Sequence, residues 1–241
     1  MTVARNLSVV HETIAAACAR ANRDPASVTL VAVSKTHPES VILEAVAAGL
    51  QHFGENRVEE GSTKIPAVNR QTPVSITWHM IGHIQSRKAK DVLPLFQVVH
   101  SVDSVKLAEK LSRLATEAGK RLDALVEINV SGEASKSGFP ASNWATEPAV
   151  RERLWQEVGQ VLALPGLNVR GLMTMAPIVE QMEQARPVFA GLAALRQALV
   201  SAFQKPLPDL SMGMTDDYPV AIEEGATIVR IGRAIFGERN Q

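Results

Sequence analysis

The sequence has few of the residues that mark several large classes of protein. It holds a single cysteine, Cys18, in 241 residues, so no disulfide can form within the chain, as is typical of a reducing compartment. Aromatic residues are only 4% of the chain, which argues against a base-stacking surface for single-stranded nucleic acid. Lys and Arg number 25, as do Asp and Glu, so no charge excess points to a polyanion or a membrane surface.

Long apolar runs are also absent. No run approaches the length of a membrane span, and charged residues interrupt 2–25, so we expect neither a transmembrane segment nor a secretory signal. Together with the lone cysteine, these absences predict a cytoplasmic protein that does not act on membranes or nucleic acid. The length is close to the roughly 250 residues of a single α/β barrel.

Short apolar runs alternate with amphipathic segments throughout the chain. An extra helix is expected at 3–23, before the first strand, and a long, mobile loop at 131–142. The helix after Arg57 is expected to end near Ile65, just before Pro66. The predicted strands are 28–34, 51–53, 76–81, 97–102, 122–130, 169–175, 209–212 and 227–231.

Strict alternation of strand and helix predicts parallel pairing with right-handed crossovers. Eight such units close into an α/β fold of the TIM type, a (β/α)8 barrel forming one domain over 1–241. An open doubly wound sheet is the alternative. That fold expects a glycine-rich phosphate loop after its first strand, where this chain has Lys35-Thr36-His37.

The first predicted strand ends in a lysine, Lys35. A charge inside a parallel sheet would be costly, whereas at the carboxyl end of the strand the side chain can reach a cleft. Partial desolvation there would lower the lysine pKa and free the amine to attack a carbonyl. The alternative interpretation is a solvated lysine that only ends the strand.

Glycines follow the seventh and eighth predicted strands, where barrels of this type often hold phosphate. The two segments are Ser211-Met212-Gly213-Met214 and Arg230-Ile231-Gly232-Arg233. Glycine lets a phosphate approach backbone N–H groups, although a tight turn is its commoner use. A lysine opposite a phosphate site indicates an aldehyde-bearing phosphate, either pyridoxal 5'-phosphate or a sugar phosphate in a Schiff-base aldolase.

Two other pairs suggest metal chemistry less strongly. His79 and His83 have the spacing of zinc ligands on a helix, but they flank a predicted strand end with no acid or cysteine beside them. Asp216 and Asp217 are better explained as a helix cap than as a cation site. We therefore expect no metal.

A set of motifs across 28–237 resembles the pyridoxal phosphate homeostasis proteins, single barrels similar to the N-terminal domain of alanine racemases. The motifs are Val31-Ala32-Val33-Ser34-Lys35-Thr36, Phe53-Gly54-Glu55-Asn56, His79-Met80-Ile81-Gly82, Ser135-Lys136-Ser137-Gly138, Gly171-Leu172-Met173, Ser211-Met212-Gly213-Met214 and Val229-Arg230-Ile231-Gly232.

The resemblance implies that pyridoxal 5'-phosphate is bound, with Lys35 as its internal aldimine. It places Arg230 at the pyridine nitrogen, Asn56 near the ring and Met173 against a ring face. The phosphate would lie among Ser211, Gly213, Gly232 and Arg233, and Met212 is a further expected cofactor-binding residue. Arg233 departs from the family pattern, in which a threonine is common at that position, so a hydroxyl donor is lost.

An arginine at the pyridine nitrogen cannot supply a proton, so the ring is a weaker electron sink than a pyridinium. Racemases also use a tyrosine from a second domain of a partner subunit; we expect no such domain here, and the only tyrosine is Tyr218. The sequence thus predicts a carrier or buffer in vitamin B6 and amino-acid homeostasis, with no efficient catalysis. The partners would be the cofactor and pyridoxal-phosphate-dependent apoenzymes, and the expected state is a monomer. A low-activity racemase or lyase, and the aldolase, remain open.

Overall fold

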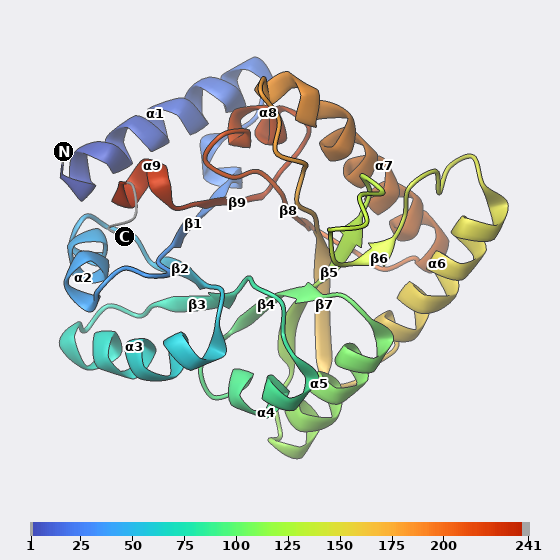
Figure 1. The fold of residues 1–241 in the computed structure, drawn as a ribbon, viewed down its shortest axis with the longest axis horizontal. Coiled ribbons are helices and arrows are strands. Elements are labelled where there is room, and N and C mark those ends of the chain that lie inside the picture. The colour runs from blue at the N-terminus through green and yellow to red at the C-terminus, as the bar shows by residue number, and fades with distance from the viewer. Residues whose placement is uncertain (1, 238–241) are drawn as a thin grey trace.

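The computed structural model describes residues 2–237; Met1 and 238–241, the ends of the expected domain, lie outside the described residues. Eight parallel strands form a closed ring, seen nearly end-on in Figure 1. They are β1 (Thr29–Val33), β2 (His52–Glu55), β3 (Thr77–Met80), β4 (Val98–Val102), β5 (Leu122–Asn129), β7 (Leu167–Met173), β8 (Asp209–Ser211) and β9 (Ile228–Ile231). Pairing of β4 with β5 closes the ring.

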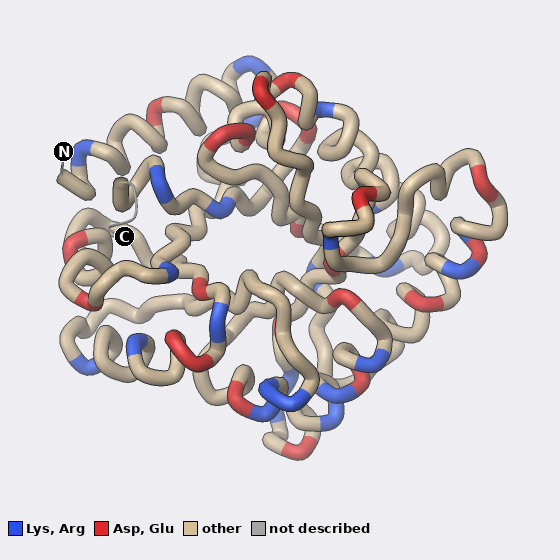
Figure 2. Tube along the Cα trace, viewed as in Figure 1, with Lys and Arg blue, Asp and Glu red and all other residues tan. Residues whose placement is uncertain are grey.

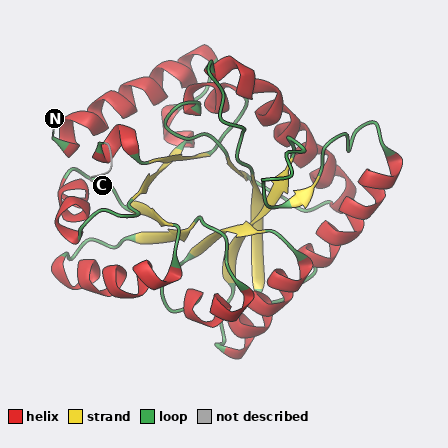
Figure 3. Cartoon of the chain, viewed as in Figure 1, coloured by secondary structure: helices red, strands yellow, loops and turns green. Residues whose placement is uncertain are grey.

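Helices surround this barrel on the outside (Figure 3). They are α1 (Val3–Arg20), α2 (Glu39–Ala47), α3 (Val58–Gln71), α4 (Ala89–Val92), α5 (Val105–Glu117), α6 (Pro148–Leu162), α7 (Arg186–Phe203), α8 (Tyr218–Glu223) and α9 (Arg233–Phe236), with 3-10 turns η1 (Pro25–Ser27), η2 (Ser86–Lys88) and η3 (Met182–Ala185). The predicted (β/α)8 barrel with an extra N-terminal helix is therefore confirmed.

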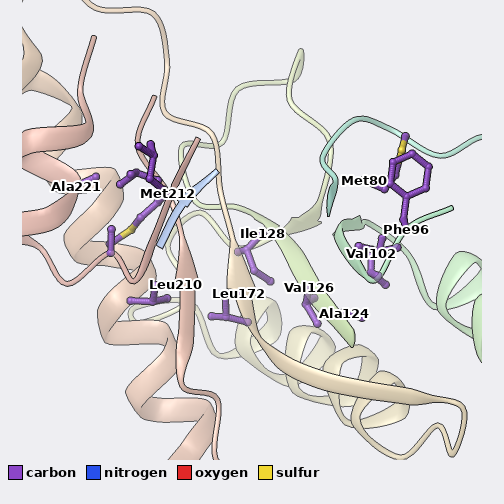
Figure 4. Close-up of a cluster of buried hydrophobic side chains, with 14 of the residues drawn as sticks. Met80, Phe96, Val102, Ala124, Val126, Ile128, Leu172, Leu210, Met212 and Ala221 are labelled. Carbon is purple, nitrogen blue, oxygen red and sulfur yellow. The ribbon is translucent and has the colours of Figure 1, made fainter. Parts of the chain in front are cut away.

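The strands are apolar on both faces because each face packs against a different layer. In β1, Leu30 and Ala32 belong to the large cluster between strands and helices, part of which is drawn in Figure 4. Val31 alternates with them and joins a small cluster with Leu125, Met173 and Ile228. That small cluster lies in the barrel interior, where side chains of alternate strands meet in this fold.

Helix α1 covers the barrel where the last helix is too short to do so. Helix α9 has four residues, and α1 lies beside it and beside α8 in the outer ring (Figure 1). The buried stripe of α1 includes Leu7, Val10 and Ile14, and Asn6 Nδ2 donates to Ile235 O at 2.8 Å. These contacts join the start of the described chain to its end.

Two expectations are wrong in detail. Helix α3 continues through Pro66 to Gln71, because residues beyond the proline pack well: Val68 is fully buried, and Asn69 Oδ1 accepts a bond from Trp78 Nε1. The segment 131–142 is not simply a loop. Its end forms a short strand, β6 (Phe139–Pro140), which pairs with the end of β5.

Charged residues of both signs are spread around the outer helices (Figure 2). Among the residues the structure describes, no helix is both long and apolar enough to cross a membrane.

Candidate functional site

A cavity of about 210 Å³ opens at the carboxyl end of the barrel. Three residues predicted from strand ends line it together: Lys35 after β1, Asn56 after β2 and Arg230 in β9. The rest of the lining is Val33, Ile81, Gly82, His83, Glu127, Ser137, Met175 and Met214. Ser137 belongs to 131–142, so this segment reaches the mouth of the cavity.

A buried ion pair makes the hydrogen bonds that hold the backbone on both sides of Lys35 in place. Lys64 Nζ donates to the Ser34 carbonyl at 2.9 Å and to Glu55 Oε1 at 3.0 Å. Ser34 Oγ donates to the same Glu55 oxygen at 2.7 Å. Glu60 Oε1 accepts from Lys64 Nζ at 2.5 Å and from the Thr36 N–H at 2.6 Å. Lys35 is thus presented by a rigid turn, half-buried at the cavity.

Glu55 is fully buried, and its burial raises the pKa of the carboxyl against the opposing effects of Lys64 and Ser34. Its second oxygen has no hydrogen-bond partner among the described residues. Sequence reasoning missed this role of Glu55 and Lys64. The available signal was an acid at the end of a predicted strand, Glu55, and a lysine nine residues later, Lys64.

Arg230 lies at the side of the cavity and is only 4% exposed. Its guanidinium donates from Nη1 to Ser211 Oγ at 2.5 Å and from Nη2 to the Thr174 carbonyl at 3.0 Å. Burial lowers the arginine pKa to about 10, while the charges of Asp217 and Glu127 oppose that shift. Arg230 therefore stays protonated at neutral pH, as the sequence reasoning requires.

Ser211 lies below the cavity surface and is fully buried. Besides Arg230, its hydroxyl contacts His100 Nδ1 at 2.9 Å, across the barrel interior. The prediction that Ser211 contacts phosphate stays a prediction, and its hydroxyl is already engaged within the protein.

The two methionines among the predicted residues have buried side chains. Met212 packs outside the barrel near Ala221 (Figure 4), and its N–H donates to the Ile228 carbonyl. Met173 belongs to the interior cluster, whereas Met175, two residues on, packs against that cluster and lines the cavity. The expected contact of Met173 with a ring remains a prediction, and the methionines that line the cavity are Met175 and Met214.

Gly213 adopts a left-handed conformation with φ of +95°. A Cβ there would lie 2.7 Å from Ala221 Cβ and 2.9 Å from Tyr218 Cα, so the turn after β8 requires glycine. The turn is closed by Asp217, whose Oδ1 accepts from the Met214 N–H at 2.6 Å. Asp217 occupies the N-cap position of α8, as expected, but its side chain makes no hydrogen bond to the first turn of that helix.

Gly232 follows β9 directly, and Arg233 is the first residue of α9. Arg233 forms an exposed ion pair with Asp216, which ties the start of α9 to the loop after β8. Asp216 is thus the partner of an arginine. The two segments predicted to hold phosphate are neighbours, as expected from the pairing of β8 with β9.

Glu127, which sequence reasoning also missed, brings a carboxyl to the cavity wall. It is 3% exposed, and burial raises its pKa to about 7, helped by the charge of Asp103 and opposed by Arg230 and His83. His83 is exposed at the rim, where its Nδ1 lies 2.8 Å from Asp103 Oδ2. The cavity therefore holds a titratable carboxyl beside a histidine–aspartate pair.

His79 and His83 do not form a metal site. His79 is buried in the barrel interior, and His83 contacts Asp103 at the rim. Within residues 2–237, no group of three or more His, Cys, Asp or Glu side chains could hold a metal ion.

The residues present fit pyridoxal 5'-phosphate. The cofactor needs an amine for its aldehyde, a partner for its ring nitrogen and backbone N–H groups near small residues for its phosphate. Lys35 and Arg230 line one cavity. The cavity extends to Met214, which directly follows Gly213 in the turn that requires a residue without Cβ.

Comparison with known proteins shows the family to which the chain belongs. Residues 6–240 match the family described as alanine racemase, N-terminal domain, so the class is that of the racemase-like barrels. Pyridoxal phosphate homeostasis proteins are 41% identical over 239 residues in Aquifex aeolicus, covering 99% of both chains, and 42% identical over 243 residues in Pseudomonas aeruginosa, covering 99% of this chain and 96% of the other. The chain therefore belongs to the pyridoxal phosphate homeostasis protein family.

A solved structure supports the same assignment. PipY of Synechococcus elongatus, determined with pyridoxal phosphate bound, is 36% identical with a TM-score of 0.81, covering 98% of this chain and all of PipY.

Proposed function

We propose that this protein holds pyridoxal 5'-phosphate covalently on Lys35 and acts as a cytoplasmic carrier or buffer of the cofactor in vitamin B6 and amino-acid homeostasis. The observation that carries the proposal is that Lys35, Asn56 and Arg230 line one cavity at the carboxyl end of the barrel. The homeostasis proteins and PipY, named above, support the choice of ligand.

Each residue has a task that follows from its surroundings. Lys35 supplies the amine, and the Glu55–Lys64–Glu60 cluster holds its backbone in place. The bound cofactor supplies an aldehyde carbon that amines attack. Arg230, which stays charged, would hold the ring nitrogen by a hydrogen bond that it donates without transferring its proton.

Slow turnover is expected because the racemase-type second base is missing from the cavity. Tyr218, the only tyrosine of the chain, is buried in α8, and its hydroxyl lies near Thr13 of α1, outside the barrel. A carrier of this kind releases the cofactor to other amines, including the active-site lysines of pyridoxal-phosphate-dependent apoenzymes. We propose that it does so as a monomer built from one domain.

One observation favours a second candidate, a low-activity racemase or lyase. Glu127 and His83 line the same cavity as Lys35, so two groups able to exchange protons stand near any bound amino acid. The Schiff-base aldolase has less support, since nothing in the cavity beyond Lys35 is specific for a sugar.

The test is the visible absorption of the purified protein after incubation with pyridoxal 5'-phosphate. Lys35→Ala should abolish the absorption band of the lysine-bound cofactor, whereas Lys106→Ala, on the exposed face of α5, should keep it. A colourless wild-type protein would defeat the proposal and leave the aldolase. Racemisation or decarboxylation of a panel of amino acids at ordinary enzyme rates would favour the second candidate.

A further inference from the structure

Three histidines form a hydrogen-bonded chain through the barrel interior. His100 Nδ1 lies 2.9 Å from Ser211 Oγ, and His100 Nε2 lies 2.9 Å from His79 Nδ1. His79 Nε2 lies 3.1 Å from His52 Nδ1. The contacts link β8, β4, β3 and β2, and they run from Ser211, which ends β8 at the cavity side, to His52, the first residue of β2.

The donors in this chain can be assigned without seeing a hydrogen. Arg230 has only donors, so Ser211 Oγ accepts from it. The serine hydroxyl is fully buried, and among the described residues His100 Nδ1 is its one recorded acceptor. His100 must then carry its proton on Nε2 and donate to His79 Nδ1, and by the same rule His79 donates from Nε2 to His52 Nδ1.

The imidazoles stay neutral, as this order requires. Burial lowers the pKa of His79 to about 3 and that of His100 well below its usual range, and burial also lowers the pKa of His52. The charged groups near Ser211, at the cavity end of this chain of contacts, are Arg230 itself and the carboxyls of Glu127 and Asp217.

We propose that a hydrogen-bond relay runs through Ser211, His100, His79 and His52, with every donor pointing in the same direction. The relay positions Arg230 through Ser211. The direction of donation reverses when the cofactor phosphate accepts a hydrogen bond from Ser211. His100 is a positioning residue in this account. The reversal rests on the proposed function, whereas the order of the relay in the apoprotein does not.

Reversal conserves the number of protons in the relay. Ser211 passes its hydroxyl proton to His100 Nδ1, takes one from the phosphate monoanion and turns its new O–H toward a phosphate oxygen. His100 passes its Nε2 proton to His79 Nδ1, His79 passes its Nε2 proton to His52 Nδ1, and the half-buried His52 releases its Nε2 proton to solvent. His52 then donates to His79, His79 to His100, and His100 to Ser211 Oγ. The serine oxygen has two lone pairs, so it accepts from His100 and Arg230 together. Binding at the mouth of the barrel is thereby reported at His52, at the other end of the relay.

The experiment is ¹⁵N NMR of the histidine side chains, with resonances assigned from single-histidine variants. In the apoprotein at neutral pH, the relay histidines should all be Nε2–H tautomers, with exposed His11 as an internal reference. An Nδ1–H tautomer or a charged imidazole at any of the three would overturn the order. After loading with pyridoxal 5'-phosphate, all three should become Nδ1–H, and unchanged tautomers would overturn the reversal.

Failure of the cofactor to bind would overturn both the proposed function and the reversal, while the apoprotein spectrum still decides the order of donors and acceptors in the relay.

Two variants of His100 test its positioning role through the affinity of the protein for the cofactor. His100→Phe removes the partner of Ser211 and should weaken cofactor binding about tenfold, the value of one such hydrogen bond. His100→Asn keeps an amide at the place of Nδ1 and should restore most of the affinity. Equal affinities of the His100→Phe and His100→Asn variants for the cofactor would contradict the positioning role of His100. The matched control is His11→Asn.

Discussion

Single residues at this site owe their properties to neighbours far along the chain. Glu127 would be an ordinary acid on a surface, but at the cavity wall its burial raises its pKa to about 7. Lys64 would be a solvated helix lysine, but it is 7% exposed and bonds to both Glu55 and Glu60. The role of each of these two residues can be tested by the effect of its substitution on the stability of the protein.

Glu127→Gln should change how stability depends on pH. The pKa of Glu127 in the folded protein is about 7, against 4.5 for an ordinary glutamate, so the folded state holds this proton more tightly than the unfolded state. Stability is therefore lost as pH rises from about 4.5 through 7, by up to about 3 kcal/mol. Urea unfolding of the apoprotein at pH 5 and pH 8 should show this loss in wild type and much less of it in the variant. The exposed Glu109→Gln control should follow wild type, and a parallel loss in Glu127→Gln would contradict the assignment.

Lys64→Met should destabilise the protein by about 3–5 kcal/mol, because it leaves the buried Glu55 carboxylate without its cation. The double variant Lys64→Met with Glu55→Gln should recover part of this loss. Lys90→Met, on the exposed face of α4, is the control and should lie within about 0.5 kcal/mol of wild type. Denaturant unfolding measures all three, and a Lys64→Met value near that of the control would show that the ion pair contributes little.

The sequence predicts the cavity residues that follow strands better than those within strands. Lys35 and Asn56, which directly follow β1 and β2, could be placed because the carboxyl ends of parallel strands meet at one edge. The histidines of the relay could not, because a polar residue inside a strand has no visible partner until the strands are in register. The partner of His100 in β8, Ser211, is 111 residues away.

Among the elements, α1 can be predicted from its local sequence pattern, whereas β6 cannot. The helix expected at 3–23 is α1, and its buried residues Leu7, Val10 and Ile14 recur at helical spacing along one face. The two residues of β6 carry no pattern. Their pairing with β5 depends on Asn129, whose side chain donates to the Glu133 and Lys136 carbonyls and folds the intervening segment back.

Ile14→Ala in α1 should cost about 2–5 kcal/mol, because Ile14 is 3% exposed and its loss leaves a cavity between α1 and the barrel. Val9→Ala lies on the same helix but is 56% exposed, so it should change stability by no more than about 0.5 kcal/mol. Thermal or urea unfolding compares the two. Similar values for both variants would mean that α1 does not pack as a structural part of the barrel.

At the scale of the whole molecule, the closed barrel brings distant strand ends to one mouth. Lys35 and Arg230 stand 195 positions apart in the sequence, yet β1 and β9 pair directly and place both at the same cavity. Strand and helix alternation was enough to predict this closure. Helix α3 beyond Pro66 was not predicted, because a proline weakens the local signal and only packing against the rest of the molecule restores the helix.

The central claim is that the amine at the end of β1 carries the cofactor. Borohydride reduction of the loaded protein fixes the attached group permanently, and mass spectrometry of the peptides then locates it. The account predicts one phosphopyridoxyl group on Lys35 and none on the equally treated Lys35→Ala variant. A stoichiometric adduct on another lysine of the wild-type protein, with Lys35 unmodified, would contradict it.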